Sequence, residues 1–151
     1  MKGGRTLKAI TLWQPWATLL TIGAKKYETR SWATKHRGTI AIHAGIKTEI
    51  KVSPEFTKIV NEYCQDFPLG CIIATAELVD CHKIVRYGGR GMSSECPGWL
   101  ETEDGIYLPT EQEELFGDWS PGRYAWEIKN IKILKEPIPA KGKQRLWNWD
   151  I

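Results

Sequence analysis

The chain has 151 residues, of which 42% are hydrophobic and 26% are charged, and its formal net charge is +3. These values are typical of an ordinary globular domain and exclude a disordered tail, a collagen-like repeat and a coiled coil. The sequence has neither the roughly 20 consecutive apolar residues of a membrane helix nor the apolar core of a secretion signal, so we expect one cytoplasmic domain over residues 1–151.

The beginning of the chain predicts a strand, a short helix and an extended polar segment. Residues 7–13 alternate as the residues of a strand do. Pro15 suits the first turn of a helix, and Gly23 suits the left-handed position just past its end. We therefore expect a helix over residues 15–22 and a partly extended segment over residues 25–32.

The middle of the chain predicts two strands with a helix between them. Residues 39–43 alternate and favour a strand. Ser53, Pro54 and Glu55 supply an N-cap, a first-turn proline and an acid that suits the helix dipole, so a helix is expected to begin here. Residues 71–84 then favour a long strand whose first half is apolar.

The last part of the chain predicts a short helix and further strands. Thr110 and Glu113 fit a capping box for a helix that Gly117 would end. Residues 123–134 favour strands with a change of register near Asn130, and the two prolines that follow are expected to break this run. Separated strands with two or three short helices predict a mainly β fold of the α+β class, built as a small mixed sheet or barrel.

The net charge hides a strong asymmetry along the chain. Residues 91–122 hold eight acids and no Lys or Arg, so the rest of the chain carries all 21 Lys and Arg against ten of the 18 acids. A basic body with one acidic insert indicates an anionic partner, with nucleic acid as the first candidate. The alternative to an anionic partner is a soluble body whose insert is simply a solvated acidic loop. The insert could also bind a protein partner.

The cysteines predict neither disulfides nor a metal site. No two of them form a C-x-x-C pair, and a chain of this size does not need disulfides to fold. We expect free thiols in a reducing cytosol, with no metal and no cofactor. A metal site formed by Cys81, His82 and Cys96 is the alternative.

The most polar segment at a structural junction is GAKKYETR, residues 23–30. In an extended stretch Glu28 and Arg30 share one face, whereas Lys25 points to the other unless a turn intervenes. Two cations around one carboxylate could form a preorganised site, in which the cations hold a phosphate or carbonyl oxygen and the carboxylate accepts from a base. A structural cluster of ion pairs is the alternative.

Aromatic and basic residues lie around this segment, as they do in proteins that bind single-stranded nucleic acid. Rings stack on bases, cations follow phosphates, and a glutamine such as Gln14 can read a base edge. Trp32 and Arg37 lie in a predicted loop and are contact candidates. Trp16 and His43 are candidates too, with core packing as the alternative for Trp16 and a satisfied strand histidine as the alternative for His43.

Two linked motifs resemble the activating-signal-cointegrator homology (ASCH) domain, a relative of the PUA superfamily. The first is the run LWQPWA at residues 12–17. The second is the hallmark G-x-K-x-x-E-x-R, matched at all four fixed positions by Gly23, Lys25, Glu28 and Arg30. The strand GTIAIH at residues 38–43 and the late segment 138–147 also fit, so the likeness covers nearly the whole chain.

The resemblance implies a PUA-like β-barrel of about five or six strands, with helices packed at its ends and a cleft beside the hallmark. Family members are associated with RNA binding, RNA processing and transcription coactivation. Lys25, Glu28 and Arg30 would then be cleft residues, and Gly23 would be the turn that admits a ligand or a backbone. We therefore expect a module that binds RNA, another single-stranded nucleic acid or a nucleotide-sized ligand.

A hydrolase is the alternative function, because some ASCH-like proteins are small amidohydrolases that act on N4-acetylcytidine. Their motif supplies a Lys and a Thr nucleophile. Lys25 matches the Lys, but Glu28 stands where the Thr is expected, and Thr29 is expected to face the other way in an extended segment. If the chain is an enzyme, an amidohydrolase or a ribonuclease, Lys25 and Glu28 are its candidate catalytic residues, with Glu77 as a distant helper. A protein-interaction or coactivator module that uses the acidic insert is a further alternative.

Overall fold

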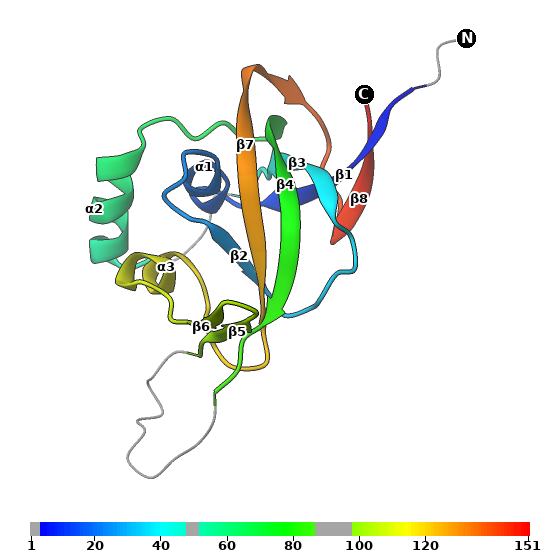
Figure 1. The fold of residues 1–151 in the computed structure, drawn as a ribbon. Helices are drawn as coiled ribbons and strands as arrows, with labels where there is room; N and C mark the ends of the chain where they lie inside the picture. The colour runs from blue at the N-terminus through cyan, green and yellow to red at the C-terminus, as the bar shows by residue number, and fades with distance from the viewer. Residues whose placement is uncertain (1–3, 48–51, 87–97) are drawn as a thin grey trace.

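The computed structural model describes residues 4–47, 52–86 and 98–151. Figure 1 shows the elements, which follow one another as β1 (Thr6–Leu12), α1 (Trp16–Thr21), β2 (Tyr27–Arg30), β3 (Gly38–Ala44), α2 (Pro54–Tyr63), β4 (Cys71–Lys83), β5 (Leu100–Thr102), β6 (Gly105–Tyr107), α3 (Glu111–Phe116), β7 (Tyr124–Pro139) and β8 (Leu146–Asp150). The prediction of a mainly β fold of the α+β class is confirmed.

Six of the strands form one mixed sheet in the order β2-β7-β4-β3-β1-β8, and β5 and β6 form a separate hairpin. β1 runs parallel to β3, and every other neighbouring pair in the six-stranded sheet is antiparallel. The pairing of β1 with β8 places the beginning and the end of the described chain side by side, with Thr6 opposite Asp150.

This sheet is open, whereas the resemblance led us to expect a closed barrel. In the described part of the chain, the edge strands β2 and β8 do not pair with each other. The reason lies in β1, whose outer edge is occupied by β8 as far as Ile10. The next carbonyl oxygen of β1, that of Thr11, accepts a hydrogen bond from Nη2 of Arg30 at 2.9 Å. The Arg30 side chain therefore links β2 to β1, at the place where a closed barrel would have backbone hydrogen bonds between two paired strands.

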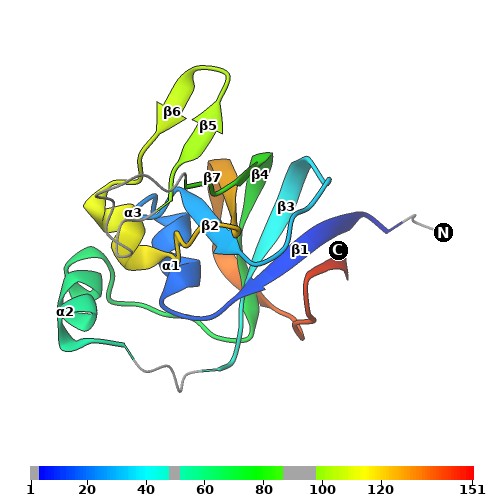
Figure 2. The same ribbon diagram turned by 90° about the horizontal axis from the view of Figure 1, so that it is seen from below.

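The three helices lie together on one side of the sheet, as the two views in Figures 1 and 2 show. The main core forms where α1 packs on the sheet, with Leu20 of the helix against Ile40, Ile42 and Trp126 of the strands. A second cluster joins the helices to one another through Leu19, Phe56, Val60 and Phe116. The helices thus form a layer that fixes the position of β2 and of the turn that precedes it.

The local signals for helix starts and ends agree with the structure. Ser53 accepts a hydrogen bond from the backbone N–H of Phe56 at 3.1 Å, as an N-cap does. Thr110 caps α3 in the same way, by accepting from the N–H of Glu113 at 3.1 Å. Gly23 has a φ of 81°, which is the left-handed conformation predicted after α1.

β7 continues through Pro137 to Pro139, so the prediction that these prolines break the strand is wrong. β2 pairs with β7 no further than Glu127, which leaves one edge of the later residues of β7 without a partner in the described sheet. A proline, which has no N–H, is tolerated at such an edge. The predicted change of register is confirmed, because Asn130 has a φ of 52° and β7 carries an extra residue there relative to β4.

The remaining expectations concern membranes, metals and cysteines. Within the described ranges no helix is long and apolar enough to cross a membrane, and no group of three or more His, Cys, Asp and Glu side chains is arranged to hold a metal ion. Cys64, Cys71 and Cys81 are free thiols. Cys96 and residues 91–97 of the acidic insert lie outside the described residues.

Candidate functional site

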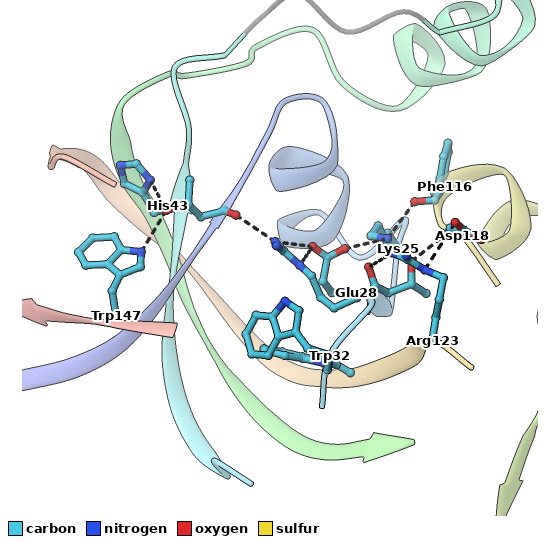
Figure 3. A network of polar contacts seen from close by, with 12 residues as sticks. Lys25, Glu28, Trp32, His43, Phe116, Asp118, Arg123 and Trp147 are labelled. Carbon is cyan, nitrogen blue, oxygen red and sulfur yellow. Dashed lines mark hydrogen bonds and ion pairs between the residues drawn. The ribbon is translucent and has the colours of Figure 1, made fainter. Parts of the chain in front are cut away.

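A cleft of about 1010 Å³ lies between the sheet and the helical layer. Its walls come from the ends of β1 and β3, from β2 and the turn before it, and from the end of α3. The segment 140–145, which connects β7 to β8, completes the lining. Figure 3 shows the polar network along this cleft, with Lys25, Phe116 and Asp118 at one end and His43 and Trp147 at the other.

Lys25 is the most buried charged group of the cleft, with only 1% of its surface exposed. Its ammonium group donates to the carbonyl oxygen of Phe116 at 2.8 Å and lies 3.3 Å from Oε1 of Glu28. A buried ammonium is costly unless it is paired and hydrogen-bonded. Lys25 precedes β2 and follows the turn at Gly23, and this turn brings it to the side of Glu28. Lys25 therefore ties β2 to the end of α3.

Glu28 and Arg30 extend the network toward β1. Oε2 of Glu28 accepts from Nε of Arg30 at 3.1 Å and lies 3.0 Å from its Nη2. Because Arg30 also donates to Thr11, the three charged residues of the hallmark span the cleft from α3 to β1. Both oxygens of Glu28 thus contact cations within the fold, as the structural alternative for this cluster requires.

Thr29 lines the same cleft as Glu28, its neighbour in the extended strand β2. Its hydroxyl oxygen accepts from the N–H of Asp118 at 3.0 Å, and Arg123 donates to its carbonyl oxygen at 3.3 Å. Gly117 permits this close packing, since an added Cβ would lie 3.1 Å from the Thr29 hydroxyl oxygen and 3.3 Å from Nζ of Lys25.

Asp118 stands at the outer edge of this end of the cleft. The hydroxyl of Ser120 donates to its carboxylate, and Arg123 lies within ion-pair distance, with Nε 3.5 Å from Oδ2. The hydrogen bond from Ser120, helped by the charge of Arg123, lowers the pKa of Asp118 below its ordinary value. Asp118 therefore stays ionised and compensates Arg123.

The other end of the cleft is built around His43, which is 1% exposed. Its Nε2 lies 2.7 Å from the carbonyl oxygen of Ala140, which can only accept, so Nε2 carries the proton. The hydroxyl of Thr11 lies 3.1 Å from Nδ1 and in turn accepts from Nε1 of Trp147 at 3.0 Å. Every ring nitrogen thus has a partner, which is the arrangement of a satisfied strand histidine.

Positive charge dominates the lining of the cleft. Two acidic residues, Glu28 and Asp118, line it in the described part of the chain. The cations outnumber them and are Lys25, Arg30, Lys47, Arg123, Lys141, Lys143 and Arg145. Two of these cations stack on tryptophans of the same lining: Nζ of Lys47 lies 4.2 Å from the ring centre of Trp13, and Cζ of Arg145 lies 4.2 Å from that of Trp32.

Most of the contact candidates come together in this cleft. The candidates that line it are Trp16, Lys25, Glu28, Arg30, Trp32 and His43. Trp16 also packs on Phe56 of α2, with ring centres 5.7 Å apart, so it serves the core as well.

Three candidates lie elsewhere. Gln14 is buried, and its amide donates to the carbonyl oxygen of Pro68 and accepts from the N–H of Thr18, so both ends are engaged within the fold. Gly23 forms the turn behind Lys25 and does not line the cleft. Arg37 is exposed, lies outside the cleft and pairs with Asp80 of β4 at 3.4 Å.

Sequence reasoning missed the cations that come from distant parts of the chain, namely Lys47, Arg123, Lys141, Lys143 and Arg145. The run KGKQR at residues 141–145 is the one signal that could have found three of them, because it places three cations in five residues between two strands. Nothing in the sequence alone places this run beside the hallmark.

Comparison with known proteins gives one family. Residues 10–138 match the model of the ASCH domain. Activating signal cointegrator 1 from Homo sapiens is 36% identical over 152 residues, a match that covers 93% of this chain and 22% of the relative. The protein of the same name from Mus musculus is 26% identical over 149 residues, with the same shares of the two chains covered. The chain thus spans about a fifth of the length of these relatives.

Proposed function

The chain belongs to the ASCH domain family, and from that premise we propose that it is a module that binds single-stranded nucleic acid, with RNA as the first candidate, in the cleft beside the hallmark. The relation of the family to the PUA-like RNA-binding fold suggests a nucleic-acid-related role. The ligand, its length and the contact residues are the parts that this proposal adds.

The observation that carries the proposal is the uncompensated positive charge of the cleft. Glu28 is shared by Lys25 and Arg30, and Asp118 pairs with Arg123. The remaining cations of the lining form no ion pair with a described residue, and they are Lys47, Lys141, Lys143 and Arg145. Such a cluster on the walls of a cleft raises the local concentration of anions and suits a phosphate backbone.

The aromatic residues of the cleft favour a single strand over a duplex. Trp13 and Trp32 line the cleft, and a ring can stack on a base only where the base is not already stacked within a helix. The volume of about 1010 Å³ is at the upper end of the range for small-ligand pockets, so it suits a nucleotide or a short segment of a strand.

The experiment is a binding titration of the full chain with a fluorescent oligouridine at low salt. The test variant is the double replacement Lys141→Ala/Lys143→Ala. The control variant is Lys132→Ala/Lys135→Ala, which removes the same charge from exposed positions of β7 outside the cleft. We expect the test variant to bind at least about tenfold more weakly, since each cation that meets a phosphate releases a counterion.

The factor by which the control pair weakens binding is expected to be less than about a third of the factor for the test pair, because these lysines attract the strand only from a distance and do not contact its phosphates. Absence of binding to both RNA and single-stranded DNA at low salt contradicts the proposal. An equal loss in the two double variants also contradicts it, because the attraction would then come from net charge and not from the cleft.

A hydrolase that acts on a modified nucleoside is the second candidate function. One observation favours it: Nζ of Lys25 and the hydroxyl oxygen of Thr29 both lie against Gly117 at the same end of the cleft. Glu28 is a poor general base there, because both its oxygens contact cations. Chromatography of N4-acetylcytidine incubated with the chain tests this candidate, which requires turnover by the wild type and its loss in Thr29→Val.

A further inference from the structure

Trp32 is held in place from behind by the core. Its ring meets that of Trp126 at 89° with the centres 4.7 Å apart, and Nε1 of Trp126 donates to the Trp32 carbonyl oxygen at 3.3 Å. Trp126 itself is fully buried in β7. A ligand that enters the cleft therefore meets an indole ring whose position is already fixed, and such preorganisation reduces the entropy lost on binding.

In the free protein, Arg145 stacks on this ring. Its guanidinium carbon lies 4.2 Å from the ring centre of Trp32. A guanidinium group is planar and takes the place on an indole face that a nucleic-acid base would take. A base that stacks on Trp32 must therefore compete with Arg145, whereas an isolated phosphate need not.

Arg145 is placed so that its side chain can leave without disturbing the fold. β8 begins at the next residue, Leu146, which pairs with Ile10 of β1, so the main chain is anchored there. The side chain is exposed, and Lys141 and Lys143 of the same segment line the same cleft. These lysines hold phosphates near the segment, so that a guanidinium group displaced from the ring by a base finds a phosphate close by, which it binds with two parallel hydrogen bonds.

We propose that Trp32 is a base-stacking subsite that Arg145 covers in the free protein, and that a base displaces Arg145, which then binds a phosphate of the same strand. This inference rests on the proposed function and deepens it, because it names the base and the phosphate as separate parts of the recognised ligand. A strand that lacks bases leaves Arg145 on the ring. When a base is present, Arg145 exchanges its contact with the Trp32 ring for a contact with a phosphate, and the base takes its place on the ring.

The first test follows the Arg145 side chain by NMR with arginine labelled in carbon-13. Protons above an indole face resonate upfield, so the side-chain signals of Arg145 should be upfield in the free protein. Trp32→Ala should abolish this shift, whereas Trp13→Ala, which alters the other stacked tryptophan, should not. Saturation with oligouridine should abolish the shift in the wild type, and saturation with an abasic strand of equal length should preserve it.

The second test measures affinity for the same two strands. Trp32→Ala should weaken binding of oligouridine by roughly 5- to 150-fold, the usual effect of removing one stacked base, and should leave the affinity for the abasic strand within about twofold. An Arg145 signal that stays upfield in the oligouridine complex overturns the inference, and so does an equal loss of affinity for both strands. If the wild type binds neither strand, the proposed function fails as well, so the two failures are distinguishable.

Discussion

At the scale of single residues, Gly142 determines how closely the segment before β8 approaches the sheet. A Cβ at this position would lie 2.7 Å from Cε1 of His43 and 2.8 Å from the hydroxyl oxygen of Thr11. Both residues belong to the hydrogen-bonded chain that links Trp147, Thr11, His43 and Ala140. A side chain at residue 142 would therefore push Lys141 and Lys143 away from the cleft.

Gly142→Ala is expected to lower the free energy of unfolding by about 1–3 kcal/mol, the usual cost of forcing extra atoms into a packed site. It should also weaken oligouridine binding, because the cations on either side of it move. Urea unfolding measures the first effect. Gly4→Ala is the control, since nothing lies within 4 Å of an added Cβ there. Equal stabilities of the two variants would show that the segment adjusts without strain.

The sequence could identify only those site residues that lie close together along the chain. Lys25, Glu28 and Arg30 fall within one short motif, and their chemistry stands out there. The pairing of β1 with β8 brings Arg145 to the same cleft, and this contact joins residues more than a hundred positions apart. Composition and spacing carry no information about such a contact, so the cations of residues 141–145 were missed.

At the scale of elements, α3 shows that the acidic insert forms part of the cleft wall. The capping box predicted at its start is only half formed, because Oε1 of Glu113 accepts from the backbone N–H of Lys26 at 2.8 Å. The carbonyl oxygen of Phe116 receives Lys25 at the other end of the helix. A solvated acidic loop was the alternative for this insert, yet Glu113 and Phe116 are buried.

Glu113 gives the stability a pH dependence whose sign follows from its burial. Burial raises the pKa of Glu113 above its ordinary value of 4.5, although the N–H of Lys26 and the charge of Lys25 oppose this effect. Since the folded-state pKa is raised, the ionised carboxylate costs stability at neutral pH. This cost disappears as the pH falls through the folded-state pKa.

Glu113→Gln keeps an oxygen that can accept from Lys26 and removes the buried charge. We therefore expect the variant to be at least as stable as the wild type at neutral pH, with an advantage that shrinks as the pH falls through the folded-state pKa. Urea unfolding across the pH range measures this difference. Glu114→Gln removes the same charge from an exposed position of α3 and is the control for net charge. An advantage that grows on acidification would contradict the sign.

The sequence predicted the ends of an element well where residues close along the chain determine them. It predicted them poorly where pairing with a distant strand determines them. The N-caps Ser53 and Thr110 were identified because an N-cap bonds to a residue three positions away. The extension of β7 through Pro137 depends on which strand occupies each of its edges, and the sequence of β7 does not contain that information.

At the scale of the whole molecule, the proposed function requires a defined response to salt. For single-stranded nucleic acid, the logarithm of the association constant falls with the logarithm of salt concentration with a slope of about −0.7 for each phosphate contacted. Lys141→Ala/Lys143→Ala should therefore make the slope shallower by about 1.4, if each lysine meets one phosphate. Fluorescence titrations over a series of salt concentrations measure it.

The control pair Lys132→Ala/Lys135→Ala should leave this slope unchanged, because these lysines do not line the cleft. A weaker affinity with an unaltered slope in the test pair would mean that Lys141 and Lys143 act on the shape of the cleft and not on phosphates.

The pairing of β1 with β8 brings the two ends of the described chain together, so we expect the fold to tolerate a different order of its elements along the chain. The N–H of Ile151 donates to the carbonyl oxygen of Arg5 at 2.8 Å, so a short peptide linker can connect the two ends. New ends can then be cut between Thr102 and Gly105, in the turn of the β5–β6 hairpin, which contributes nothing to the cleft. This circular permutant is expected to unfold cooperatively and to bind oligouridine as the wild type does, and circular dichroism and fluorescence titration measure the two properties. Loss of the fold on permutation would show that β1 and β8 need their present connections to find each other.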